Sequence, residues 1–109
     1  MKFKSSDIGG EIVKQDDRYI VKDNKALKNL VVSSTCLHGG KSTSGHSHPG
    51  QEEVYQFIYG AGEMELDDKR FPVQPGDIVL IEDGVFHRVH NTSSTELYFV
   101  CVFDGKRNH

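Results

Sequence analysis

Turn-forming residues recur at short intervals along the chain and divide it into apolar runs of strand length. These runs are rich in Val, Ile, Tyr and Phe or alternate polar with apolar residues, and they cover residues 30–37, 53–59, 63–66, 78–81, 86–89 and 96–103. Gly-Gly, Pro-Gly, Asp-Gly and Asn-rich breaks separate them, as short antiparallel strands require. Helical spacing of apolar residues is confined to a single turn near residues 25–30. The sequence therefore predicts an all-β domain, closed as a sandwich or barrel and preceded by short strands between residues 11 and 28.

Length, composition and charge limit the number of domains and the kinds of molecule that the chain is expected to bind. A chain of 109 residues is long enough for one compact domain and too short for two. Its 13 Lys and Arg against 16 Asp and Glu give a net charge of −3, so we expect neither nucleic acid nor a membrane as partner. Residues 1–10 contain no apolar leader, which predicts a cytoplasmic protein. Cys36 and Cys101 lie in apolar runs and are expected to be reduced thiols.

Six histidines in so short a chain need a chemical reason. His46 and His48 are separated by one residue, and alternate residues of an extended segment face the same side. Glu53 opens the next predicted strand, whose alternation places the competing Glu52 on the opposite face. His87 follows a turn and can supply a third imidazole. Three imidazoles and one carboxylate suit a divalent first-row transition metal. The remaining histidines are expected to serve only surface or packing roles: His38, His90 and His109.

Two spacing patterns carry a resemblance to a known family. In the first, a glycine, a His-x-His pair, a glutamate and a second glycine follow at fixed intervals: Gly40, His46, His48, Glu53 and Gly60. In the second, two glycines, a histidine and an asparagine do so: Gly76, Gly84, His87 and Asn91. Together they resemble the two motifs of the cupin superfamily. Glu82 stands where the family usually has proline.

The resemblance implies a fold and a metal site. The fold is a single small double-stranded β-helix, also called a jelly roll or cupin barrel, over residues 29–104. Residues 1–28 would supply N-terminal strands, exchanged between the copies of a dimer, and residues 105–109 a polar tail. By the same resemblance, one divalent ion of Fe, Mn, Ni, Zn or Cu is held by four ligands: His46, His48, Glu53 and His87.

The activity rests on a shorter likeness. The segment Ser44–Met64 is similar to the metal-site segment of cupin sugar-phosphate isomerases, which implies an isomerase or epimerase that uses the metal as a Lewis acid on a sugar or sugar phosphate. Glu53 and Tyr55 are the candidates for moving the proton. The same spacing also suits an iron-dependent dioxygenase, or a non-catalytic protein whose metal holds a small molecule such as a sugar.

Strand alternation also predicts the pocket and the outer surface. Tyr55, Phe57 and Tyr59 share a face with Glu53. Tyr55 and Phe57 are expected to line the substrate pocket with Phe86, while Lys41 is placed to meet an anionic substrate. Val54 and Ile58 point the other way. Because exposed apolar residues need cover, we expect a homodimer.

Overall fold

The computed structural model describes residues 1–105 and consists of nine antiparallel strands with no helix among those residues. The strands are β1 (Glu11–Gln15), β2 (Tyr19–Asn24), β3 (Leu30–Leu37), β4 (Glu53–Tyr59), β5 (Gly62–Leu66), β6 (Lys69–Val73), β7 (Ile78–Ile81), β8 (His87–His90) and β9 (Leu97–Asp104). The predicted all-β class is confirmed. The predicted tail at residues 105–109 lies, beyond Gly105, outside the described residues. Residues 1–105 contain no helix long and apolar enough to span a membrane.

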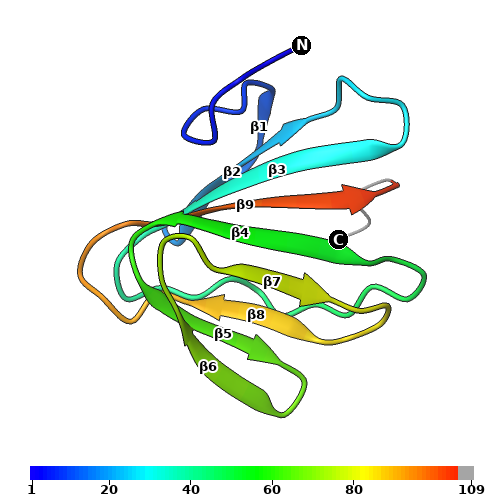
Figure 1. The fold of residues 1–109 in the computed structure, drawn as a ribbon. Helices are drawn as coiled ribbons and strands as arrows, with labels where there is room; N and C mark the ends of the chain where they lie inside the picture. The colour runs from blue at the N-terminus through cyan, green and yellow to red at the C-terminus, as the bar shows by residue number, and fades with distance from the viewer. Residues whose placement is uncertain (106–109) are drawn as a thin grey trace.

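The strands form two sheets that face each other (Figure 1). A six-stranded sheet has the order β1-β2-β3-β9-β4-β7, and a three-stranded sheet has the order β6-β5-β8. The chain before β4 extends the small sheet, because Thr43 N–H donates to the Val89 carbonyl at 2.9 Å and His87 N–H donates to the His46 carbonyl at 2.8 Å. This pairing brings the His46 segment alongside β8.

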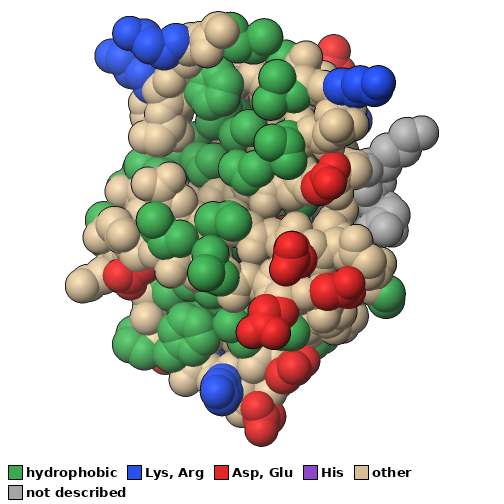
Figure 2. Space-filling view, turned by 45° about the vertical axis from the view of Figure 1, so that its right-hand side comes forward, with side chains coloured by type: hydrophobic (Ala, Val, Ile, Leu, Met, Phe, Trp, Pro, Cys, Tyr) green, Lys and Arg blue, Asp and Glu red, His purple; other side chains and the backbone are tan. Residues whose placement is uncertain are grey.

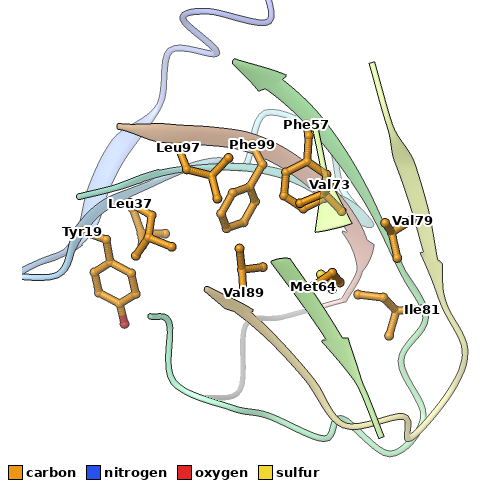
Figure 3. Close-up of a cluster of buried hydrophobic side chains, with 11 residues drawn as sticks. Tyr19, Leu37, Phe57, Met64, Val73, Val79, Ile81, Val89, Leu97 and Phe99 are labelled. Carbon is orange, nitrogen blue, oxygen red and sulfur yellow. The ribbon is translucent and has the colours of Figure 1, made fainter. Parts of the chain in front are cut away.

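The apolar core fills the space between the two sheets. Phe57 and Phe99 reach down from the large sheet, and Met64 and Val89 reach up from the small one (Figure 3). Phe57 and Met64 are fully buried. Tyr19, Val21 and Phe99 of this core also line a cavity, so the core borders the site described below.

The N-terminal segment covers part of the outer face of the large sheet. Ile8 is buried against Tyr98 and Val100, and the Tyr98 hydroxyl donates to the Ser5 carbonyl at 2.7 Å. Ile58 packs into this cluster and is half-buried. β1 pairs with β2, and β2 pairs with β3, all within the same chain. Exchange of these strands between two copies stays a prediction, as does the boundary at residues 28 and 29.

Two local features differ from the expected pattern. β6 was not expected, because Pro72 and the preceding Asp-Asp-Lys turn conceal a strand; it lies at a sheet edge, where a missing N–H is tolerated. Strand alternation predicted that Tyr59 shares the inner face with Glu53, and this prediction is wrong. A register shift between Phe57 and Tyr59 turns it outward, where its ring stacks on Tyr98 at 5.0 Å.

Candidate metal centre

Three buried side chains from different parts of the chain meet at one point. His48, Glu53 and His87 are each at most 5% exposed, and each offers a ligand atom within 4.8 Å of the others. The Oε1 atom of Glu53 is 3.7 Å from Nε2 of His48 and 3.7 Å from Nε2 of His87. The two imidazoles therefore face the same carboxylate oxygen.

Backbone pairing fixes each of these residues. Glu53 is the first residue of β4 and lies opposite Phe103 of β9 and Ile81 of β7. His48 begins a turn that is closed by the Gln51 N–H, which donates to the His48 carbonyl at 3.0 Å. The choice of Glu53 over the exposed Glu52 agrees with the strand alternation used to make it.

The turn before His87 forms without the proline that the cupin pattern usually has there. Val85 N–H donates to the Glu82 carbonyl at 3.1 Å, and Gly84 takes the left-handed φ of 77° that a glycine adopts without strain. The carboxylate of Asp83 accepts the Gly50 N–H at 2.7 Å. The turn is thus tied to the loop between His48 and Glu53, which keeps the ligand segments together.

The environment of His87 favours a neutral ring with Nε2 as the acceptor. Nδ1 lies 3.2 Å from the Val85 carbonyl, so the proton belongs on Nδ1, where it is donated to that oxygen. Burial lowers the pKa of His87. A neutral imidazole whose free lone pair faces a carboxylate is the form that binds a metal.

These donors fit a divalent first-row ion. Metal bonds to His nitrogen and carboxylate oxygen are about 2.0–2.2 Å long, so an ion fits between atoms 3.7 Å apart. His46 is the fourth predicted ligand. Its ring centroid lies 5.3 Å from that of His48 and 6.3 Å from that of His87, beside the three-residue group. Its role as a ligand stays a prediction.

A cavity opens beside the metal centre, and its lining differs in part from the predicted pocket. Tyr55 lines it as expected, next to Glu53 and His87. The other lining residues come from the strands on both sides: Lys14, Tyr19, Val21, Ser33, Thr35, Thr43, Ser44, His46, Phe99, Cys101 and Phe103. The cavity wall is therefore a mixture of hydroxyl groups, aromatic rings and one lysine.

Three residues expected in the pocket lie elsewhere. Phe57 is 0% exposed within the core. The Phe86 ring packs over Gly45, where a Cβ atom would come within 2.2 Å of it, so a larger residue there would have to displace the ring. The ammonium of exposed Lys41 is 3.7 Å from the Asp17 carboxylate. None of the three lines the cavity.

Sequence reasoning missed most of the polar wall. Ser33 and Thr35 alternate along β3 and face inward, a pattern that was visible in the sequence. His90, for which only a surface or packing role was expected, connects two parts of the chain. It bridges Ser42 and Glu65, with Nδ1 2.7 Å from the serine hydroxyl and Nε2 2.8 Å from the carboxylate. The bridge ties the chain before His46 to β8 and β5.

The chain belongs to the cupin family. The family model for the cupin domain matches residues 34–103, which include every residue of the metal centre. Similar folds are double-stranded β-helices; one such protein from Klebsiella pneumoniae superposes with a TM-score of 0.80 at 20% identity, covering 94% of this chain and 88% of the other. The predicted fold is confirmed.

Relatives with different activities share this family. An oxalate-binding protein of Thermotoga maritima is 33% identical over 66 residues, which cover 61% of this chain and 54% of the relative. A glucose-6-phosphate isomerase of Thermococcus kodakarensis is 26% identical over 124 residues, covering 98% of this chain and 66% of the relative. This chain thus spans only part of the length of either protein.

Proposed function

We propose that this cupin is a metal-dependent enzyme that isomerises or epimerises a small polar molecule, a sugar or sugar phosphate. The observation that carries the proposal is the cavity wall. Four hydroxyl side chains, Ser33, Thr35, Thr43 and Ser44, face the same cavity as Glu53 of the metal centre. Such a wall suits a ligand with several hydroxyl groups, because each can exchange a hydrogen bond with water for one with the protein. The similarity to glucose-6-phosphate isomerases supports the same substrate class.

A divalent metal bound at this centre would polarise a carbonyl or hydroxyl oxygen of the substrate. The protein's own residues then have to move a proton between neighbouring carbons. We assign this step to the Glu53 carboxylate, which would accept the proton from one carbon, leaving the electron pair of the broken C–H bond on the substrate, and return it to the next carbon. A carboxylate has two oxygens, so one can face the imidazoles while the other carries the proton.

Tyr55 is placed to serve the substrate oxygens. Its ring stacks on Phe99 at 5.3 Å between centroids and meets the His87 ring edge-on at 5.8 Å. These contacts hold the phenol in the cavity wall beside the metal centre. As the proton moves between carbons, a second proton must move between the attached oxygens, and a tyrosine hydroxyl can donate and accept it.

A second candidate is a non-catalytic protein that holds a small molecule through the metal. The 33% identity to an oxalate-binding protein favours it. Both candidates need the same three-residue centre, and only turnover separates them. An iron-dependent dioxygenase, the third possibility for this ligand set, is distinguished by its consumption of oxygen.

The test begins with metal analysis of protein purified without an affinity tag. The loaded protein is then incubated in D2O under anaerobic conditions with sugars and sugar phosphates, and NMR follows both product and the exchange of carbon-bound hydrogen for deuterium. Exchange that is lost in His87→Ala supports the isomerase. Tight binding without exchange supports the binding protein, and turnover that appears only with oxygen supports the dioxygenase.

We also propose that a second copy of the chain covers the outer apolar patch, defined as Val54, Ile78, Leu80 and Val102. Leu80 is 69% and Ile78 61% exposed, and cross-strand pairing places Val54 beside both Leu80 and Val102. Hydrophobic side chains reach the surface over much of the face shown in Figure 2. The four residues of the patch are apolar, so a second copy that covers them would remove apolar surface from water. Light scattering should give a dimer for the wild type and a monomer for Leu80→Asp.

A cytoplasmic location stays a prediction.

A further inference from the structure

We propose that Lys14 is a specificity-determining residue that binds the anionic group, a carboxylate or a phosphate, of the small molecule held beside the metal centre. The inference rests on the proposed function and deepens it by naming the charge of the substrate. Three observations carry it: a bulge in β1, the inverted burial of that strand, and the charge of the cavity wall.

The bulge places Lys14 on the inner face. β1 pairs with β2 through Ile12 opposite Lys22, but the next pair is Lys14 opposite Val21, so Val13 is an extra residue. Regular alternation would keep Lys14 on the same outer face as Ile12. The extra residue shifts the parity and puts Lys14 beside Val21, which is buried. Bulges near active sites commonly re-aim a side chain in this way.

In β1 the apolar side chains are exposed and the lysine is half-buried, which is the reverse of the burial expected in an edge strand. Ile12 is 55% and Val13 38% exposed, whereas Lys14 is half-buried and is the one residue of β1 that is not exposed. Turning a lysine inward while two apolar residues face solvent opposes the hydrophobic effect. Local violations of this kind are expected where a residue has a function.

The charge of the cavity wall points to the ligand. Lys14 lines the cavity together with Glu53, His87 and the hydroxyl side chains, and it is the one Lys or Arg among the lining residues described. The nearby Arg18 is not among the lining residues; its guanidinium pairs with Asp16 at 2.9 Å and donates to the Ser44 hydroxyl of the cavity wall at 2.8 Å. A lysine that lines the same cavity as Glu53 and His87 suits a ligand that bears an oxyanion as well as metal-binding oxygens.

The test compares Lys14→Met with Lys14→Arg and with Lys22→Met. Methionine keeps most of the apolar stem, arginine keeps the charge, and Lys22 lies on the outer face of the same strand pair, so it is the matched control. Calorimetry measures binding of inorganic phosphate, oxalate, a hexose 6-phosphate and the free hexose to the metal-loaded full chain. Metal content is measured for every variant.

We expect Lys14→Met to bind the anionic probe about ten- to a hundredfold more weakly, the usual value of one charged hydrogen bond. Affinity for the free hexose should not change, and the arginine variant and Lys22→Met should stay within a few-fold of wild type. Added salt should weaken anion binding to the wild type more than to Lys14→Met. The phosphate and oxalate results identify which anion is preferred.

Other outcomes separate this inference from the proposed function. If the metal-loaded wild type binds neither anion, or if Lys14→Met binds them as tightly as wild type, the role of Lys14 is overturned even if an uncharged sugar turns over. If Lys14→Met weakens anion binding and no substrate turns over, Lys14 keeps its role and the isomerase proposal fails.

Discussion

Glu53→Gln should remove most of the stability that metal binding adds to the fold. Glu53 supplies one of the three clustered ligand atoms and the only negative charge among them. Metal at about one hundred times its Kd raises the free energy of unfolding by about 2.7 kcal/mol. Losing a residue that only hydrogen-bonds to a metal ligand weakens metal binding about 10–100-fold. Losing a ligand itself should therefore weaken metal binding by at least about 100-fold.

At the same metal concentration the variant would then be near its own Kd and keep only about 0.4 kcal/mol of that stabilisation. The difference of about 2.3 kcal/mol corresponds to a metal-induced rise in Tm that is smaller by about 10 °C in a domain of this size. Thermal unfolding followed by circular dichroism, with metal and with chelator, measures it. The neighbouring Glu52→Gln is the control, since that side chain is exposed. An equal rise in Tm for wild type and Glu53→Gln, or its loss in Glu52→Gln, would refute the ligand assignment.

Three further predictions concern the scaffold around the centre. Phe57→Ala should lower the free energy of unfolding by about 3–5 kcal/mol, because the side chain is fully buried, whereas the exposed Leu80→Ala should change it little; denaturant titration compares the two. Burial and the contact with Glu96 raise the pKa of the Cys36 thiol to about 11, so a thiol reagent at pH 8 should modify Cys36 more than tenfold more slowly than a free cysteine; a rate equal to that of the free thiol would contradict the contact. His90→Ala should loosen the chain before the metal ligands and weaken metal binding about tenfold in a direct titration, while an unchanged Kd would mean that the bridge from Ser42 to Glu65 has no such role.

Sequence pattern was a good guide wherever strand alternation is uninterrupted. β3, β4 and β7 have the expected bounds, and Glu53 faces inward as its parity predicts. His48, Glu53 and His87 come together in the structure as their sequence spacing predicts. Each lies at the start of a strand or at a closed turn, and local hydrogen bonds set these positions. Strand starts and turns of this kind can be predicted from a single sequence, because they depend on neighbouring residues.

Two of the misses share one physical cause. Tyr59 was expected inside and lies outside, while Lys14 was not expected in the cavity and lines it; each follows a register shift in its strand. A bulge is a property of two paired strands, because it is defined by which residues lie opposite one another, and no single run of residues contains that information. Bulges also accumulate where a barrel bends and where a site needs a side chain that regular alternation would turn away. Single-sequence reasoning therefore predicts the cluster of candidate metal ligands in such a barrel more readily than the residues that line its cavity.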